Sequence, residues 1–250
     1  MARAERKPQL PRRLSFKRPK GEQLQEFLEE FVASLEPGAM LPSERALAEK
    51  YEVARMTVRQ ELDRLESKGL IQREQGRGTF VAQPKFTQSE ALTSFTEDMH
   101  ARGMVPGSAV LSQEITDAHE IVARELGITT GSAVVLIERI RTADGEPMAY
   151  ERAYLPAERF AGLEDEDLSV GSMYELLERR WKVDLHDARQ RVTAVVVNDE
   201  EAKLLNVPVG QPAFLFQRTT HDGSGSVVEY VRSLYRGDRY EVDTHLDRRT

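Results

Sequence analysis

The sequence predicts an α+β protein with two domains, and three observations support this prediction. At 250 residues the chain exceeds the usual size of a single domain, although one large domain would also fit. Stretches with the apolar spacing of helices alternate with β-rich runs bounded by turn residues. Charge is uneven: residues 1–86 carry 17 Lys and Arg against 13 Asp and Glu (net +4), whereas the remainder carries 18 against 29 (net -11). A basic first third in a chain of net charge -7 indicates either a polyanionic partner or a solvated basic face.

The composition excludes several classes of protein. The chain is 40% hydrophobic and 31% charged, as ordinary globular proteins are. No apolar run is long enough to span a bilayer, and residues 1–20, which we expect to form a basic flexible tail, lack the apolar core of a secretory signal. The absence of cysteine excludes disulfides and thiolate metal sites. We therefore expect a cytoplasmic protein without a membrane partner.

Residues 21–82 are predicted to form the first domain. Its predicted elements are helices over 21–36, 44–51 and 55–68 and strands over 70–73 and 78–81. Ser43 stands where the second helix needs an N-cap, and Gly69 stands where the third helix ends. Helix, helix, turn, helix and hairpin is the order of a winged helix-turn-helix, a fold that binds DNA. The alternative is a small α+β subdomain whose arginines are merely exposed.

The third predicted helix and the tip of the hairpin carry side chains that suit DNA. Apolar residues repeat at helical spacing on one face, at Val58, Leu62 and Leu65. The first turn and the opposite flank carry side chains that donate to phosphate oxygens or base edges, namely Arg55, Thr57 and Arg59. Glycine at the hairpin tip lets the backbone approach another surface, and arginine suits a narrow minor groove. We expect DNA contacts there from Gln75, Arg77 and Gly78.

A continuous run of this domain resembles the DNA-binding domain of GntR-type bacterial transcription regulators: LPSERALAEKYEVARMTVRQELDRLESKGLIQREQGRGTFV. The resemblance implies DNA contacts at Arg45, Arg55, Thr57, Arg59 and Gly78. Two residues depart from the family pattern, which usually has a small hydroxyl residue at Ala54 and alanine at Glu61. Ala54 removes an N-cap worth about 1 kcal/mol. Glu61 adds a negative charge to the helix, so both residues put the family's usual operator preference in question.

Residues 83–91 lack periodicity and are predicted to form a linker to a second domain over 92–248. Helix-length segments alternate there with β-rich runs and turn signals, which is typical of an α+β domain with an antiparallel sheet. The predicted helices cover 94–102, 117–126, 172–180 and 199–205.

Two stretches of the second domain share one plan: ARELGITTGSAVVLIERIRTADGEPMAYERAYL and AKLLNVPVGQPAFLFQRTTHDGSGSVVEYVRSLY. Each passes from a helix end through a glycine-containing loop into a strand, an Asp-Gly turn and a return strand. When the two Asp-Gly turns are aligned, Glu151 falls on Glu229. We predict a pseudo-symmetric pair of hairpins with equivalent carboxylates; the alternative is a coincidence of hairpin sequence patterns.

Polar residues lie at alternate positions of these strands. Arg139 and Arg141 are two residues apart, hence on one face, where two guanidinium groups form a fork for a phosphate. Glu229 and Tyr235 share a face of another strand and offer a carboxylate, an apolar ring and a hydroxyl to a small ligand. For each residue the alternative is a surface ion pair or a core tyrosine. A two-residue turn would leave Glu151 on the face opposite Arg139, whereas an odd loop would place them side by side, and the sequence leaves both registers open.

The second domain also resembles a known family. Four runs look like the effector-binding UTRA domain of the HutC subfamily of GntR regulators, closest to repressors that respond to N-acetylglucosamine metabolism: LTSFTEDMHARGMVPGS, RIRTADGEPMAYE, SMYELLE and RSLYRGDRYEV. The resemblance implies a chorismate-lyase-like fold and a phosphorylated amino sugar as effector. It implies phosphate contacts from Ser94, the Phe95 backbone, Arg139, Arg141, Ser172 and Tyr174, and sugar contacts from Glu151, Glu229 and Tyr235.

These observations favour a ligand-controlled transcription regulator, which would bind palindromic double-stranded operator DNA as a homodimer and sense a sugar phosphate. One alternative is an enzyme that uses Glu151 and Glu229 as a carboxylate pair. The sequence opposes it, because no motif for an activated nucleophile is present, the five histidines are scattered, and no metal or cofactor is indicated. A second alternative is a DNA-binding protein that responds to no metabolite.

Overall fold

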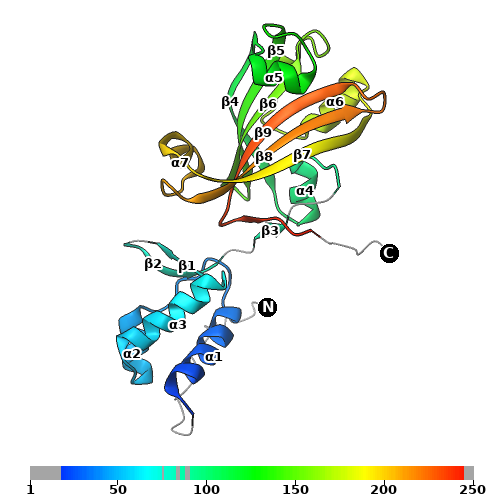
Figure 1. Ribbon diagram of the computed structural model, residues 1–250. Helices are drawn as coiled ribbons and strands as arrows, with labels where there is room; N and C mark the ends of the chain where they lie inside the picture. Colours follow the sequence, from blue (N-terminus) through cyan, green and yellow to red (C-terminus); the bar gives the residue numbers. More distant parts are fainter. Residues whose placement is uncertain (1–17, 75, 83–84, 88–90, 245–250) are drawn as a thin grey trace, which may run out of the picture. The chain divides into compact units, whose positions relative to one another are not determined.

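The computed structural model describes residues 18–74, 76–82, 85–87 and 91–244 (Figure 1). The chain divides into two compact units, Met1–Pro84 and Lys85–Thr250. The predicted tail up to residue 17 and the predicted DNA contact Gln75 lie outside the described residues. Within the described ranges, no helix combines the length and the apolar composition needed to cross a membrane.

The first unit is the predicted winged helix-turn-helix. Its elements are α1 (Lys20–Ala33), α2 (Glu44–Tyr51), α3 (Arg55–Ser67), β1 (Ile71–Glu74) and β2 (Gly78–Val81). The two strands pair in antiparallel fashion and form the wing. The Oγ of Ser43 accepts a hydrogen bond from the backbone N–H of Ala46 at 3.2 Å, which confirms its predicted role as a helix cap. Gly69 has φ +69° just beyond α3, a conformation that glycine adopts without strain.

One apolar core holds the three helices and the wing together. Each helix buries the apolar residues that recur at helical spacing, including Leu28 of α1, Leu47 of α2 and Leu62 of α3. Ile71 of β1 closes the same core. Complete burial of a side chain of this size contributes about 1.5–3 kcal/mol to the free energy of folding. The packing therefore fixes which side of α3 remains exposed.

The second unit is the predicted α+β domain with an antiparallel sheet, and the sheet has six strands with helices on both faces (Figure 1). Its strands are β4 (Pro106–Asp117), β5 (Ala133–Ala143), β6 (Glu146–Pro156), β7 (Leu185–Val196), β8 (Pro212–Asp222) and β9 (Val227–Arg236). Its helices are α4 (Phe95–Ala101), α5 (Glu120–Leu126), α6 (Met173–Trp181) and α7 (Asp199–Leu205), with a 3₁₀ turn, η1 (Leu163–Asp165). The four helices fall within the four segments predicted as helical, apart from one residue at the end of α6.

The second unit repeats one motif twice. The element order α4-β4-α5-β5-β6 is followed by α6-β7-α7-β8-β9. The spatial order of the strands, β4-β5-β6-β9-β8-β7, is symmetric about the contact between β6 and β9. The pair of hairpins inferred from the sequence is therefore the inner part of a larger repeat.

Within each half-repeat the two helices cover opposite faces of the sheet, so that α4 and α6 share one face and α5 and α7 share the other. On one face Val135 packs with Leu177 of α6 and with η1. Its neighbour Val134 points to the other face and packs with Val122 of α5, and Leu205 of α7 packs on that same face. This alternation follows from the two-residue period of a strand. Between the first turns of α4 and α6, polar side chains replace the apolar ones on the first face.

Part of the segment predicted as a linker is a strand instead. β3 (Phe86–Thr87) pairs in parallel with β10 (Tyr240–Glu241), close to the end of the described chain. Phe86 packs in a cluster with Met99 of α4 and Met148 of β6. Such a two-residue strand has no periodicity to reveal it in the sequence, and its partner lies more than 150 positions away.

Candidate functional site

A polar cavity in the second unit lies between one face of the sheet and the first turns of α4 and α6. Its lining includes all but one of the predicted effector residues: Ser94, Phe95, Arg139, Arg141, Glu151, Tyr174, Glu229 and Tyr235. The exception is Ser172, which is buried and caps α6, with its Oγ accepting a hydrogen bond from the backbone N–H of Glu175 at 3.4 Å. The antiparallel sheet thus brings residues from distant segments into one cavity.

Arg139 of β5 stands directly opposite Glu151 of β6. The turn between the strands has two residues, with Ala143 opposite Glu146, and by itself it would leave Glu151 on the other face. However, β6 contains a bulge. Arg141 pairs with Ala149 and Thr142 pairs with Pro147, so Met148 is an extra residue without a partner on β5. The bulge shifts the register by one and places both side chains in the cavity. The Nε and Nη2 of Arg139 donate to the Oε1 of Glu151, at 3.1 Å for Nε.

Arg141 is held next to Arg139, and each residue is only 3% exposed. The Nη2 of Arg141 donates to Thr96 Oγ1 at 3.1 Å and its Nη1 donates to Ser108 Oγ at 3.3 Å. Its guanidinium group also lies 4.6 Å from the ring centroid of Phe95. Burial and the charge of Arg139 lower the pKa of Arg141 to about 10, so Arg141 remains charged at neutral pH.

The two arginines keep donors that no protein group satisfies. Among the described residues, Nη1 of Arg139 and Nε of Arg141 are buried without a hydrogen-bond partner. An unsatisfied buried donor is costly, typically by about 1–3 kcal/mol and by more when charged. This end of the cavity is therefore suited to an anion with several acceptor oxygens.

Glu229 provides a second, chemically different end of the cavity. Its Oε1 accepts hydrogen bonds from the hydroxyl of Tyr174 at 2.7 Å and from Thr220 Oγ1 at 2.9 Å. Its Oε2 is buried without a hydrogen-bond partner among the described residues. Glu229 thus offers an acceptor to a ligand that carries hydroxyl or amino donors.

The two glutamates lie on equivalent strands but differ in electrostatics. Burial by itself would raise the pKa of Glu151, but the charges of Arg139 and Arg141 outweigh burial and keep that pKa below its ordinary value. Burial raises the pKa of Glu229 above its ordinary value, because hydroxyl partners and the charge of Arg218 only partly offset it. In the first half-repeat the residue opposite the glutamate is Arg139, and in the second it is Thr220. That difference breaks the pseudo-symmetry of the cavity.

We predict opposite pH dependence for two matched substitutions at these glutamates. Because the pKa of Glu229 is raised on folding, its ionisation destabilises the protein as pH rises above about 4.3, the ordinary carboxyl value. The stability of Glu229→Gln relative to the unsubstituted protein should therefore increase from pH 4 to 7, by about 1.4 kcal/mol for each unit of pKa shift. Because the pKa of Glu151 is lowered, the relative stability of Glu151→Gln should decrease over the same range. Urea unfolding at several pH values measures both trends, and parallel trends would contradict the assignment.

The sequence did not single out several residues of the cavity. Arg218 of β8 is the most important, because it is a third guanidinium group in the lining. Its Nε donates to Oε1 of Gln190 at 2.9 Å and its Nη1 to the backbone carbonyl of Thr93 at 3.2 Å. The available signal was the two-residue period of β8, which puts Phe216 and Arg218 on one face. Thr96, Asp98 and Met173 complete this set.

Aromatic rings connect the cavity to β3, the first strand of the second unit. The ring of Tyr235, which lines the cavity, lies 4.1 Å from the ring of Tyr240 in β10, measured between centroids. Tyr240 in turn lies 5.6 Å from Phe86 of β3. A second connection runs through Asp98 of the cavity wall, which pairs at 2.8 Å with Arg102, whose Nη2 also donates to the backbone carbonyl of Thr87. Residues of the cavity wall are thus connected to β3 by direct side-chain contacts.

In the first unit, the predicted DNA-contact residues of the helices lie at the surface. Arg55 and Arg59 are exposed and Thr57 is half-buried, all within the first two turns of α3. Arg59 donates to Glu44 of α2, with its Nη2 3.2 Å from Oε2. Arg45 pairs with Glu49 at 2.8 Å. Exposed ion pairs of this kind contribute at most about 1 kcal/mol, so phosphate oxygens can displace the carboxylates.

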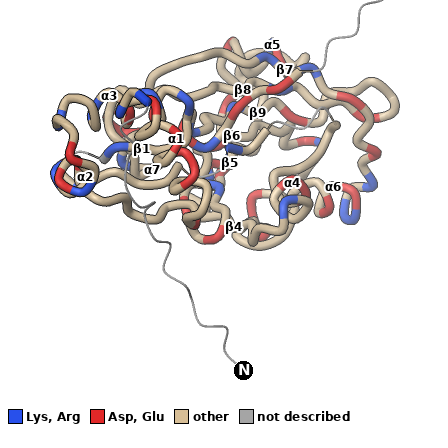
Figure 2. The backbone as a smooth tube through the Cα atoms, turned by 90° about the horizontal axis from the view of Figure 1, so that it is seen from below, with Lys and Arg blue, Asp and Glu red and all other residues tan. Residues whose placement is uncertain are grey.

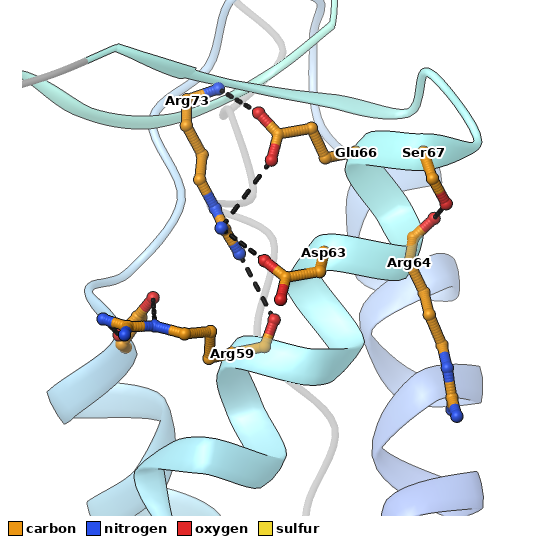
Figure 3. A network of polar contacts seen from close by, with 7 residues as sticks. Arg59, Asp63, Arg64, Glu66, Ser67 and Arg73 are labelled. Carbon is orange, nitrogen blue, oxygen red and sulfur yellow. Dashed lines mark hydrogen bonds and ion pairs between the residues drawn. The ribbon is translucent and has the colours of Figure 1, made fainter.

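The wing is anchored to α3 through Arg73 (Figure 3). The Nη1 of Arg73 lies 2.5 Å from Asp63 and 3.7 Å from Glu66, and its Nη2 donates to the backbone carbonyl of Arg59 at 3.3 Å. The predicted contacts of the wing, Arg77 and Gly78, are exposed, and Arg77 lies over the ring of Phe80. Gly78 has φ +130°, which favours glycine. Arg73 therefore fixes the wing relative to the helix that carries Arg59.

Glu61 does not lie on the surface that carries Arg55 and Arg59. It is 3% exposed, and both of its oxygens accept hydrogen bonds from Nη1 of Arg64 at 2.9 Å. Ala54 is the N-cap residue of α3 and makes no side-chain capping bond, as its sequence predicted. Figure 2 shows that both basic and acidic residues occur along α2 and α3.

The winged helix-turn-helix and the cavity domain together define a ligand-responsive transcription regulator. Residues 21–81 match the family of bacterial regulatory proteins described as gntR, and residues 101–241 match the UTRA domain. The chain belongs to the GntR family and carries a UTRA effector-binding domain.

Similarity to known proteins extends along most of the chain. It is 41% identical over 215 residues to the HTH-type transcriptional repressor NagR of Bacillus subtilis (strain 168), covering 86% of this chain and 88% of that protein. It is 34% identical over 212 residues to the repressor PhnF of Mycolicibacterium smegmatis, covering 85% and 86%. The crystal structure of PhnF from Mycobacterium smegmatis superimposes with a TM-score of 0.65 at 32% identity and covers 90% of this chain and 100% of that one.

The chain is therefore a transcriptional repressor of the GntR/HutC type, not an enzyme. Its helix-turn-helix binds DNA and its UTRA domain binds a small-molecule effector. The relatives named above are transcriptional regulators as well, in agreement with the prediction of a binding protein.

Proposed function

We propose that this repressor binds palindromic operator DNA as a homodimer in the cytoplasm, and that a phosphorylated sugar controls its affinity. Glucosamine-6-phosphate and N-acetylglucosamine-6-phosphate are the effectors we favour. The observation that carries the proposal is the pair of buried guanidinium groups of Arg139 and Arg141, which line the cavity and each keep one N–H without a partner among the described residues. A related repressor that answers to a different anionic metabolite is the alternative, because the same donors would bind any compact anion.

The polarity of the cavity supports a ligand with two unlike ends. At one end Arg139 and Arg141 offer a cationic fork, with Ser94 and the backbone of Phe95 alongside, and a phosphate matches these donors. At the other end Glu229 offers an unpaired carboxylate oxygen, which suits sugar hydroxyl or amino groups. An anion with no donors would satisfy the first end alone. A sugar phosphate satisfies both.

The size of the DNA-contact face supports a dimer. A single short recognition helix with a wing reads few base pairs, and helix-turn-helix proteins gain affinity by binding two half-sites about one helical turn apart. A two-fold symmetric protein on a palindromic site supplies both contacts. In this arrangement we assign base contacts to Arg55, Thr57 and Arg59, phosphate contacts to Arg45, and minor-groove contacts to the wing residues Gln75, Arg77 and Gly78.

The connection from the cavity to β3 supports control by the effector. Ser94 begins α4 shortly after β3, and Tyr235 of the cavity reaches Phe86 through Tyr240. A ligand that draws the first turn of α4 toward Arg139 and Arg141 changes the packing around Phe86. Since β3 follows the junction between the two units, this change alters how freely the DNA-binding unit moves relative to the second unit.

Thermal unfolding with a panel of sugar phosphates tests the proposal. At a concentration 100 times Kd, a ligand that binds only the folded protein stabilises it by about 2.7 kcal/mol. We expect a rise in Tm with the two hexosamine phosphates, a smaller rise with inorganic sulfate, which can occupy only the cationic end, and none with the unphosphorylated sugars at the same concentration. By linkage, operator DNA must change effector affinity by the same factor as the effector changes operator affinity. Operator affinity that no sugar phosphate alters would refute the proposed effector class.

A further inference from the structure

The exposed side of α3 carries one apolar residue among polar ones. In this helix, all of which lies within the described residues, Met56 is the only exposed apolar residue, and it is 61% exposed. The other exposed residues are polar or charged, namely Arg55, Arg59, Gln60, Asp63, Arg64, Glu66 and Ser67. A single exposed apolar side chain is ordinary on a protein surface. The meaning of Met56 therefore depends on where it lies.

Met56 lies in the first turn of α3, on the side opposite the core. It precedes the buried Val58 by two residues, and a helix turns by about 100° per residue, so the two side chains leave the helix about 200° apart. One turn further on, its neighbours on the helix surface are Arg59 and Gln60, which are both exposed. In helix-turn-helix proteins, the first residues of the second helix of the motif contact base edges in the major groove. Met56 is thus at the centre of the side of α3 that faces the groove.

The chemistry of methionine limits what Met56 can contact there. Its side chain has no N–H or O–H to donate and no charge, so it cannot bind a phosphate as Arg45 can, and its sulfur is only a weak acceptor. Placed against the polar edge of a base, it would leave the donors and acceptors of that base without partners, at a cost in free energy. The C5 methyl group of thymine is the one apolar group that base pairs present in the major groove.

We infer that Met56 contacts the C5 methyl group of a thymine and so selects a T·A pair at one position of each operator half-site. This inference rests on the proposed function, in which α3 makes the base contacts. It adds a different kind of contact, because Arg55, Thr57 and Arg59 recognise hydrogen-bonding groups whereas Met56 recognises an apolar one. The unbranched, polarisable side chain of methionine adapts readily to such a surface.

Removal of methyl groups from the DNA tests the inference in the full-length protein. The duplex is one that the protein selects from a random pool, and each thymine in turn is replaced by deoxyuridine, which lacks the methyl group but keeps every hydrogen-bonding group of thymine. Burial of one methyl group corresponds to about a fourfold change in affinity. Fluorescence anisotropy should therefore show one thymine in each half-site at which deoxyuridine weakens binding about fourfold, and the remaining thymines serve as internal controls. Equal binding to all of the substituted duplexes would overturn the inference, and this result depends on no variant of the protein.

Two variants assign the sensitive thymine to Met56. Met56→Ala should bind the unmodified duplex about fourfold more weakly and lose no further affinity when that thymine becomes deoxyuridine. Met56→Leu keeps an apolar side chain and should keep the sensitivity. Because Met56 is exposed and both replacements favour helices, urea unfolding should match that of the unsubstituted protein. If Met56→Ala remains as sensitive to deoxyuridine as the unsubstituted protein, another residue contacts the methyl group and the inference is wrong.

Arg59→Ala, measured on the same duplexes, distinguishes failure of this inference from failure of the proposed function. If Arg59→Ala loses discrimination against mismatched DNA but no thymine is sensitive to loss of its methyl group, α3 contacts bases and only the role of Met56 is refuted. If Arg59→Ala also keeps full discrimination, the placement of this side of α3 in the groove is refuted together with the role of Met56.

Discussion

Arg139→Ala is expected to abolish the response to the effector while the DNA-binding unit keeps its affinity for the operator. The substitution removes half of the cationic fork and leaves Glu151 buried without its counter-charge. Breaking a buried ion pair on one side typically costs about 3–5 kcal/mol. The variant should therefore unfold at lower denaturant concentration and show no effector-induced change in operator affinity. Urea unfolding measures the first effect and fluorescence anisotropy of labelled operator DNA measures the second.

A double variant separates the loss of stability from the loss of binding. Arg139→Met combined with Glu151→Met removes both charges and keeps similar volumes, and such replacements of buried ion pairs are often neutral or stabilising. We expect this protein to regain most of the stability lost in Arg139→Ala and to remain unresponsive to the effector. A double variant that responds normally would show that Arg139 does not bind the effector. Loss of operator binding in both Arg139→Ala and the double variant would mean that DNA binding and effector binding are not separate functions of the two units.

Arg59→Ala is expected to reduce discrimination between operator and mismatched DNA by about 1–3 kcal/mol, the usual value of a good base contact. Arg59 is exposed in the second turn of α3, and its partner Glu44 is a weak competitor for the guanidinium group. By contrast, Arg45→Ala should weaken binding to all sequences equally and reduce the salt dependence of binding by about one counterion, as loss of a phosphate contact does. Binding titrations with operator and mismatched duplexes at several salt concentrations measure both effects.

Arg64→Ala provides the matched control for Arg59→Ala. Both arginines are on α3, but Figure 3 shows that they extend from different sides of the helix. Arg64 pairs with the buried Glu61 and is not expected to contact DNA. Its replacement should leave discrimination unchanged. Equal effects of the two substitutions would indicate a general change in stability or charge, and an unchanged sequence preference in Arg59→Ala would count against a base contact by Arg59.

The sequence alone determined the features that depend on neighbouring residues. The winged helix-turn-helix followed from helix caps and apolar spacing. Ser43 caps α2 through a hydrogen bond to a residue only three positions away, and Val58, Leu62 and Leu65 lie on one side of α3. The adjacency of Arg139 and Arg141 followed from the two-residue period of a strand. Local geometry fixes such relations, so no knowledge of the rest of the chain was needed.

The tertiary structure decided what depends on distant residues. The bulge at Met148 brings Glu151 to Arg139, yet the sequence allowed either register, because strand pairing is fixed by packing over the whole sheet. Arg218 became part of the cavity only once β8 paired with β9, and β3 exists only because β10 returns beside it. The burial of Glu61 was likewise decided by tertiary packing, because helical spacing shows which residues share a side of a helix but not which side is covered.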